Sequence, residues 1–188
     1  MLGPILRGDL VSLQPPRLED MLTYLSWHAD PQVSYFLWGR PSVASLRQQE
    51  DWYERVAEAE SEIAWRIVVE DRTVGRASIF GIDWLNRRAE TSTVIGEPSL
   101  WRCGIGSAVV TLRCEYAFDE LGLERLETVS LVGNVGMHRA LERSGYRNLT
   151  RLHRFVYRHG DWHDVYLFEL LRSDWQTIQD SPSCHHQP

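Results

Sequence analysis

A pair of glycines stands between an expected strand and an expected long helix, and this junction limits how the chain can fold. The stretch reads Val94-Ile95-Gly96-Glu97-Pro98-Ser99-Leu100-Trp101-Arg102-Cys103-Gly104-Ile105-Gly106-Ser107. Apolar residues then recur at helical spacing up to Tyr116, which predicts an amphipathic helix. Glycine lets backbone N–H groups approach an anion closely, and a helix N-terminus adds unpaired donors and a favourable dipole. The stretch therefore predicts either a pyrophosphate cradle, to which Arg102 adds a charge, or a tight turn that packs the helix on the sheet.

Two common phosphate-binding motifs do not fit this stretch. A Walker-type loop would end in Gly-Lys followed by Ser or Thr, and that ending is missing. A dinucleotide fingerprint needs a third glycine, but Val109 occupies its position. A diphosphate with a different tail is therefore the phosphate ligand that the stretch favours.

The order of the expected elements predicts a mixed α/β (α+β) domain. Helical spacing from Leu18 ends before Pro31, a loop is expected over residues 33–41, and Ser45 with Gln48 forms a capping box that opens a second helix. Strands are expected over 10–13, 63–70, 74–82, 89–96, 125–131, 147–158 and 163–171, with helices over 105–116 and 135–144. This order differs from the alternating pattern of a Rossmann fold. We expect one domain over residues 1–175 and a frayed tail over residues 176–188.

Charge and cysteine content argue against several classes of protein. The 188 residues carry a formal net charge of −6, which argues against a nucleic-acid binder and suits either a cationic partner or a plain acidic surface. Cys103, Cys114 and Cys184 show neither a CxxC motif nor regular spacing, so we expect no disulfide framework and no metal site. Because no apolar leader and no run of membrane-spanning length occurs, we expect a cytoplasmic protein without a membrane partner.

Motifs spread over residues 8–172 occur in the order of a known family. Trp101-x-x-Gly104-x-Gly106 resembles the coenzyme A motif (Q/R)xxGx(G/A) of the GCN5-related N-acetyltransferases (GNAT). Its tryptophan, together with Arg87-Arg88-Ala89-Glu90 and Ile95-Gly96-Glu97-Pro98, is similar to the ribosomal-protein-alanine and spermidine acetyltransferase-like branch. Asn134 to Gly145-Tyr146 resembles the N-x(10)-G-(F/Y) helix of the family, and residues 157–164 resemble its closing hairpin.

The resemblance implies a GNAT fold, a bent mixed sheet of about seven strands with flanking helices. Two central parallel strands would splay apart around acetyl-coenzyme A, with the backbone of Val94, Ile95 and Gly96 pairing with the pantetheine amides. Asn134 would hydrogen-bond the pantetheine arm, and its alternative role is a helix N-cap. The other implied coenzyme A contacts are Trp101, Arg102, Cys103, Gly104, Ile105, Gly106, Ser107 and Arg139.

The activity implied is transfer of an acetyl group from acetyl-coenzyme A to a primary amine, by direct attack in a ternary complex. A protonated alkylamine has a pKa of about 10.4, so a base or a water relay must deprotonate it. Glu90 is the first candidate for this base, and its alternative role is a carboxylate paired with Arg87 or Arg88 on the sheet face. Asp83 and Glu97 are weaker candidates.

The residue that would protonate the leaving thiolate is missing from its two usual positions. Many relatives place a tyrosine seven residues after the asparagine, where this chain has Leu141, and another branch places a serine three residues after it, where this chain has Met137. Both residues lie on one helical face, which is typical of core packing. The alternative function is therefore a coenzyme A-binding sensor or scaffold without catalysis. A third hypothesis is a structural α/β domain without a cofactor.

Aromatic residues mark the expected acceptor pocket, which the resemblance places between the first two helices, their loop and the closing hairpin. The candidates, for which core packing is the alternative, are Trp27, Tyr35, Phe36 and Trp38. The acceptor is left open between a protein N-terminus, a polyamine, an aminoglycoside and another small amine. A homodimer is one assembly that we consider.

Overall fold

The computed structural model describes residues 1–37 and 44–180. Within these ranges eight strands form one sheet in the order β1-β2-β3-β4-β5-β6-β8-β7. Their bounds are β1 Leu6–Arg7, β2 Ser12–Gln14, β3 Glu62–Val69, β4 Arg72–Asp83, β5 Arg88–Ile95, β6 Arg125–Leu131, β7 Arg147–Arg158 and β8 Asp161–Leu171. The central strands β5 and β6 pair in parallel, and the other neighbouring pairs are antiparallel. The expected mixed sheet is confirmed. Its extra strand is the two-residue β1, which is too short to leave an alternating pattern in the sequence.

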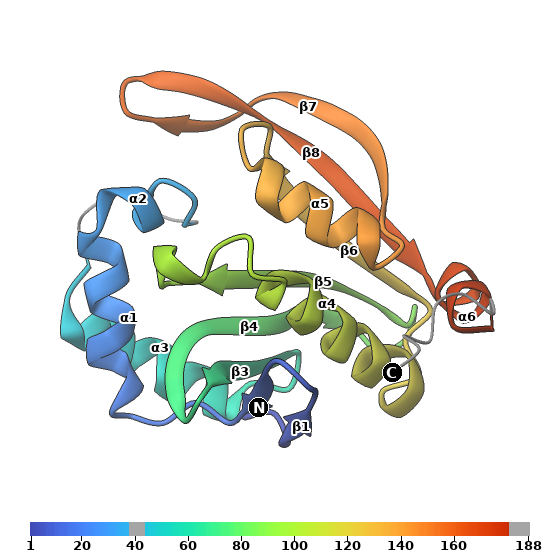
Figure 1. Cartoon of the computed structure of the whole chain (residues 1–188), viewed down its shortest axis with the longest axis horizontal. Helices are drawn as coiled ribbons and strands as arrows, with labels where there is room; N and C mark the ends of the chain where they lie inside the picture. The colour runs from blue at the N-terminus through green and yellow to red at the C-terminus, as the bar shows by residue number, and fades with distance from the viewer. Residues whose placement is uncertain (38–43, 181–188) are drawn as a thin grey trace.

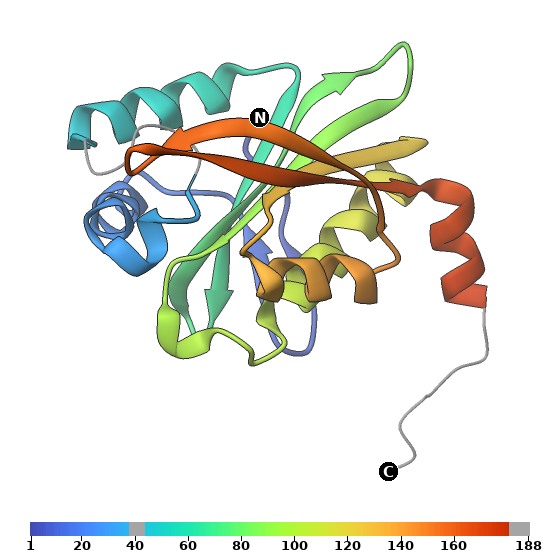
Figure 2. The ribbon, with the colours of Figure 1, turned by 90° about the horizontal axis from the view of Figure 1, so that it is seen from above.

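Helices cover both faces of the sheet (Figure 1). On one side lie α1 (Asp20–Ala29), α2 (Pro31–Ser34) and α3 (Leu46–Glu58), and on the other α4 (Ile105–Glu115) and α5 (Val135–Arg143). Figure 2 shows the strands passing between these two groups, while α6 (Arg172–Asp180) leaves the end of β8. The short turns η1 (Pro98–Leu100) and η2 (Tyr116–Glu120) precede and follow α4. Within the described ranges, none of the helices combines the length and the apolar character that crossing a membrane requires.

Local capping signals set the bounds of the first helices. The Ser45 hydroxyl accepts a hydrogen bond from the Gln48 N–H at 3.3 Å, and the Gln48 side chain accepts one from the Ser45 N–H at 2.9 Å, as the capping box predicts. Asp30 likewise caps α2 by accepting from the Gln32 N–H at 2.8 Å. Because Pro31 is preorganised for the first helical position, residues 33 and 34 are helical rather than part of the expected loop. The strand that was expected over residues 10–13 is β2, which lies at Ser12–Gln14.

The C-terminal segment is ordered further than its polar composition indicates. Residues 176–180, which we expected to belong to a frayed tail, complete helix α6. Trp175 anchors this helix because its side chain is buried and its ring lies 6.1 Å from that of Phe118. Residues 181–188 lie outside the described ranges.

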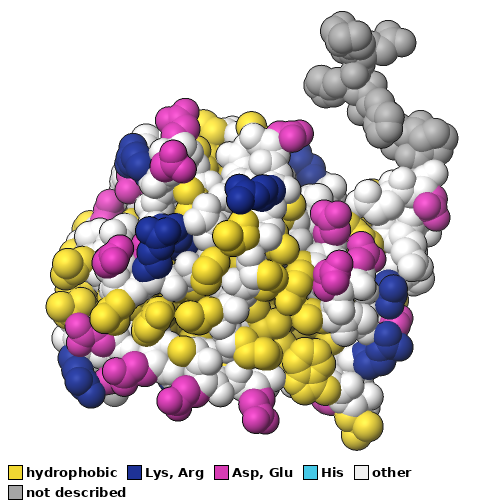
Figure 3. Space-filling view, turned by 90° about the horizontal axis from the view of Figure 1, so that it is seen from below, with side chains coloured by type: hydrophobic (Ala, Val, Ile, Leu, Met, Phe, Trp, Pro, Cys, Tyr) yellow, Lys and Arg dark blue, Asp and Glu magenta, His cyan; other side chains and the backbone are white. Residues whose placement is uncertain are grey.

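Two apolar clusters fill the space between the sheet and the helices. The larger one packs α4 and α5 on the sheet and includes Trp65, Leu126 and Phe168. The smaller one lies under α1 and α2 and consists of Met21, Tyr24, Trp27, Val33 and Leu37. Figure 3 shows a further band of apolar side chains across the face of the molecule seen from below, with charged side chains on either side of it.

Candidate functional site

The parallel strands β5 and β6 separate after three residue pairs. The last pair is Glu90 with Glu127, although both strands continue for several residues. Two threonines hold the point of separation: Thr91 donates from its hydroxyl to the Glu127 carbonyl at 3.2 Å, and Thr128 donates to the Thr91 carbonyl at 2.8 Å. These side-chain bonds replace ladder bonds, and beyond them β5 and β6 no longer pair with each other. The splayed parallel pair that the sequence implied is therefore present.

The glycine stretch forms the N-terminus of α4 beside this gap. Gly104 is the N-cap residue with a φ of +82°, a conformation that side chains bearing a Cβ rarely adopt, and Arg102 also has a positive φ. The first hydrogen bond of the helix runs from the Ala108 N–H to the Gly104 carbonyl, which leaves the preceding N–H groups without helical partners. A Cβ on Gly106 would lie 3.8 Å from Ala140 of α5, so this glycine is not required by packing alone. The residues present fit a pyrophosphate group.

The three residues expected to pair with pantetheine at the end of β5 do not all direct their backbone polar groups toward the gap. The Gly96 N–H donates to the Val74 carbonyl of β4 at 2.9 Å, so Gly96 and, by strand alternation, Val94 direct their polar groups toward β4. Ile95 directs its groups toward the gap. Trp101 donates from its indole nitrogen to the Ile95 carbonyl at 2.9 Å, which ties the loop before α4 to the strand.

Asn134 serves as the N-cap of α5. Its side-chain oxygen accepts from the Met137 N–H at 3.3 Å, so the alternative role weighed for it is observed, while its amide nitrogen is available to a ligand. Leu141 is buried in the larger core cluster, and Met137 packs against that cluster. The helix face that carries the thiolate-protonating residue in many relatives is therefore closed by packing here. Arg139 is exposed on the opposite side of α5.

Glu90 lies at the point where the strands separate. It is exposed, whereas its neighbours Ala89 and Thr91 are buried toward α4, so alternation places its carboxylate on the α1–α3 side of the sheet. Asp83 is instead engaged by the amide and side chain of Asn86 and by Arg88, which together hold its pKa below the ordinary value. The alternative pairing of Glu90 with Arg87 or Arg88 is not observed, because within the described ranges these arginines pair with Glu124 and Asp83.

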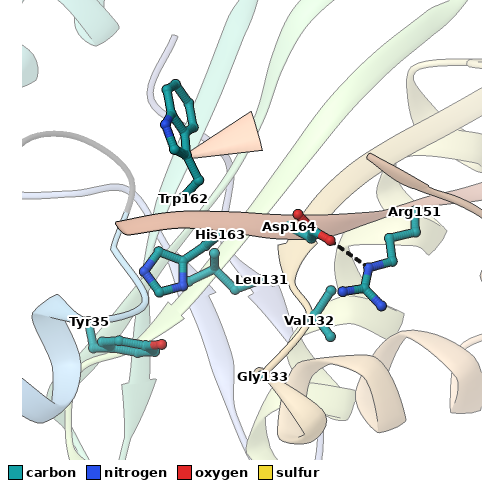
Figure 4. A pocket seen from close by; sticks show the side chains of 8 residues that line it. All are labelled: Tyr35, Leu131, Val132, Gly133, Arg151, Trp162, His163 and Asp164. Carbon is teal, nitrogen blue, oxygen red and sulfur yellow. Dashed lines mark hydrogen bonds and ion pairs between the residues drawn. The ribbon is translucent and has the colours of Figure 1, made fainter. Parts of the chain in front are cut away.

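Two cavities open on this side and share Tyr35 as a wall. One of about 280 Å³ lies between α2, the end of β6 and β8, and is lined by Tyr35, Leu131, Val132, Gly133, Arg151, Trp162, His163 and Asp164. Figure 4 shows the Tyr35 hydroxyl turned toward the end of β6. The other cavity, of about 360 Å³, is lined by Pro31, Gln32, Tyr35, Phe36 and Trp101. Trp27 belongs to the core and contacts Gly96, and Trp38 lies outside the described residues.

The β7–β8 hairpin holds the loop that carries Tyr35. Arg158 is buried and donates to the Tyr35 carbonyl at 2.6 Å and to the Leu37 carbonyl. The Tyr35 ring stacks on His159 at 5.7 Å between centroids and meets the edge of His163 at 6.2 Å. We did not single out these hairpin residues as site residues, although they fall in a segment that carries the family resemblance.

The lining of the first cavity includes one arginine, Arg151, and one carboxylate, Asp164. Asp164 accepts hydrogen bonds from the Arg154 N–H, the Arg151 Nε and the His153 Nδ1, and these donors lower the pKa of its carboxyl to about 2. Arg76 of β4 lies over the rings of Tyr24 and Trp52, and burial lowers the pKa of its guanidinium. No group of three or more His, Cys, Asp or Glu side chains within residues 1–37 and 44–180 is arranged to hold a metal ion.

Comparison with known proteins points to one family. A family model described as an acetyltransferase (GNAT) domain matches residues 11–147. The protein p20 of Bacillus licheniformis, by name an uncharacterized N-acetyltransferase, is 25% identical over 172 residues, which are 89% of this chain and 96% of p20. YdaF of Bacillus subtilis, by name a candidate ribosomal N-acetyltransferase, is 27% identical over 130 residues, 67% of this chain and 68% of YdaF.

Solved structures share the fold at low sequence identity. Spermidine N-acetyltransferase from Vibrio cholerae, in complex with CoA and spermine, is 17% identical with a TM-score of 0.82 over 90% of this chain and 99% of that one. A GNAT-family acetyltransferase from Bacillus anthracis is 16% identical with a TM-score of 0.77 over 90% of this chain and 99% of that one. At these identities the likeness establishes the arrangement of strands and helices.

Proposed function

Because the chain belongs to the GNAT acetyltransferase family, we propose that it transfers an acetyl group from acetyl-coenzyme A to a primary amine by direct attack in a ternary complex. The observation that carries this proposal is the separation of β5 and β6 after Glu90, directly beside the glycine-containing N-terminus of α4. An extended thiol-bearing arm fits between the strands while a diphosphate fits the helix N-terminus. No other opening in the described residues combines these two features.

The coenzyme A site consists of three parts in this proposal. The N–H groups of residues 105–107 bind the pyrophosphate, the Ile95 N–H donates to pantetheine, and the amide nitrogen of Asn134 donates to the same arm. Arg102 and Arg139 are exposed cations, and in this proposal they add charge for the phosphates. When bound, the thioester supplies the acetyl group and a thiol leaving group.

Glu90 accepts the proton of the incoming ammonium, directly or through water. Its place at the last strand pair sets the carboxylate beside the start of the gap, on the side where Tyr35 and the two cavities receive the acceptor. A coenzyme A thiol has a pKa near that of cysteine, about 8.5, so it leaves as a thiolate without a dedicated acid. Solvent or the departing proton of the amine then protonates it.

The test of this proposal combines binding and chemistry. Gly104→Val places a β-branched residue at a φ of +82° and should abolish coenzyme A binding in calorimetry, with circular dichroism confirming the fold. Glu90→Gln should lower kcat, most strongly at low pH where little free amine exists, by about 10²–10⁴-fold. Unchanged coenzyme A affinity in the first variant would refute the site. An unaltered pH–rate profile in the second would move the base to another group, such as His163.

One observation favours the second candidate function, a coenzyme A-binding sensor or scaffold. The helix face of Met137 and Leu141 offers no proton donor. Release of thiol from acetyl-coenzyme A in the presence of a panel of amines separates the two functions. Coenzyme A binding without thiol release from any amine would support the sensor.

A further inference from the structure

The first cavity, of about 280 Å³, has one carboxylate in its lining, and this carboxylate already accepts hydrogen bonds from the protein. Asp164 is the acidic residue of its lining, and both of its oxygens accept hydrogen bonds from the hairpin itself. Oδ1 accepts from the Arg154 N–H at 2.7 Å, and Oδ2 accepts from the Arg151 Nε at 2.7 Å and the His153 Nδ1 at 2.9 Å. A ligand with two or more ammonium groups would find no free carboxylate here to replace the water it loses.

Unlike Asp164, Arg151 retains polar groups for a ligand, because its terminal N–H donors are not engaged by any described residue. Its Nε is engaged by Asp164, whereas its two terminal nitrogens have no hydrogen bond to any residue in the described part of the chain. Figure 4 shows these terminal nitrogens turned away from Asp164 at the border of the cavity. About half of the side chain is exposed, so an anion can reach it. A guanidinium edge with two parallel donors matches a carboxylate.

The surroundings of Arg151 strengthen this preference. Strand β7 contains four arginines and one histidine but no acidic residue, although the whole chain has a net charge of −6. Arg151 and Asp164 are the arginine and the carboxylate in the lining of this cavity, and because the hairpin already engages Asp164, the remaining donors of Arg151 favour an anionic group on the ligand.

We infer that the acceptor amine carries a carboxylate of its own, that Arg151 binds this carboxylate, and that polyamines are poor substrates. This inference rests on the proposed function and narrows its substrate class. A peptide with a free amino terminus and an acidic residue next to it has this chemistry, as does a free amino acid. The rings of Tyr35 and His163, which meet edge to face at 6.2 Å, suit the apolar part of such a molecule.

The experiment compares matched amines by thiol release from acetyl-coenzyme A. The probes are the tripeptide amides Ser-Asp-Ala, Ser-Asn-Ala and Ser-Lys-Ala, free serine against serine amide, and spermidine. We expect kcat/KM for the aspartate peptide to exceed that for the asparagine peptide by about tenfold. This is the ratio that one charge-assisted hydrogen bond at a half-exposed site supplies. Serine against serine amide tells whether a free amino acid is the source of the carboxylate.

Variants of two arginines on β7 test whether Arg151 causes the preference for the aspartate peptide. Arg151→Gln should reduce the aspartate-to-asparagine ratio to about one, and Arg151→Lys should restore part of it. Arg154→Gln is the matched control, because its guanidinium lies over the Trp162 ring at 5.5 Å and does not line the cavity. Calorimetry with the acetylated aspartate peptide, in the presence of coenzyme A, should show the same loss of affinity in Arg151→Gln alone.

Each outcome has one meaning. Equal use of the three peptides together with equal use of serine and serine amide would overturn this inference and leave the acetyltransferase intact. A preference for the lysine peptide or spermidine, or an equal effect of Arg154→Gln, would overturn it in the same way. A loss of coenzyme A affinity in Arg151→Gln would also overturn it, because Arg151 would then serve a coenzyme A phosphate. Failure of all the amines to release thiol would refute the proposed function instead.

Discussion

The indole nitrogen of Trp101 donates a hydrogen bond to the carbonyl of Ile95 at 2.9 Å. This bond joins the two parts of the proposed coenzyme A site, the end of β5 and the loop that leads into α4. The Trp101 ring also packs against the smaller core cluster and lies 6.3 Å from the Phe36 ring. One residue thus connects the cofactor strand, the phosphate loop and the wall of the second cavity.

Trp101→Phe keeps an aromatic ring but removes this hydrogen bond. We expect coenzyme A affinity to fall about fivefold, because a single hydrogen bond contributes about 1 kcal/mol. Isothermal calorimetry measures this change. Trp84→Phe is the matched control, since the Trp84 indole donates to the Glu60 carbonyl at 3.0 Å, in another part of the molecule. An equal loss in both variants, or in neither, would contradict the role given to Trp101.

Gly96→Ala tests the contact between β5 and α1. A Cβ at this position would lie 2.0 Å from Cε2 of Trp27, which is buried, so the ring or the strand must move. We expect a loss of about 1–3 kcal/mol in the free energy of unfolding, together with weaker coenzyme A binding. In the background of Trp27→Leu the alanine should cost less, and a double-mutant cycle in urea measures that coupling. Additive effects would show that the two residues do not contact one another.

Leu141→Tyr tests whether a missing acid limits the rate. Leu141 is buried in the larger core cluster, so the tyrosine should overpack it and cost about 1–3 kcal/mol of stability without raising turnover. Melting temperature and turnover are measured on the same sample. A stable variant with a faster rate would show that this helix face borders the thioester and that an acid had been restored there.

The Asp164 carboxyl predicts a pH dependence of stability. Its pKa is lowered to about 2 by the Arg154 N–H, Arg151 and His153, so the folded state favours the ionised form. The stabilisation is present above the unfolded pKa of about 3.9 and is lost as the pH falls toward about 2. The difference in unfolding free energy between wild type and Asp164→Asn should therefore be constant above about pH 5 and shrink below about pH 4. Urea titrations at several pH values measure it, and a difference independent of pH would contradict the assignment.

The sequence predicted the features that depend on local patterns. The Ser45 capping box, strand β6 and the glycines at the start of α4 follow from hydrogen-bonding groups and apolar spacing within a few residues. The family of the chain could be predicted for the same reason, because its motifs are short and ordered along the chain. The parallel pairing of β5 and β6 was implied by the resemblance rather than by the spacing of their residues.

Features that depend on contacts across the chain could not be predicted. Arg158 is bonded to the carbonyl of Tyr35, 123 residues away, and nothing local to either residue marks that contact. The orientation of Gly96 toward β4 depends on the register between β4 and β5, which a one-residue shift would reverse. Residues 176–180 have few apolar side chains, so the helix there depends on the docking of Trp175.

Acetyl transfer to an amine can be measured directly by mass spectrometry of the acceptor. Wild-type protein and Glu90→Gln are incubated with acetyl-coenzyme A and an amine panel that includes the Ser-Asp-Ala amide. We expect an amine to gain the mass of one acetyl group, far faster with wild type than with the variant. If no amine gains that mass above the enzyme-free control while coenzyme A still binds, the chain is not an N-acetyltransferase for these amines, and the coenzyme A-binding sensor replaces it.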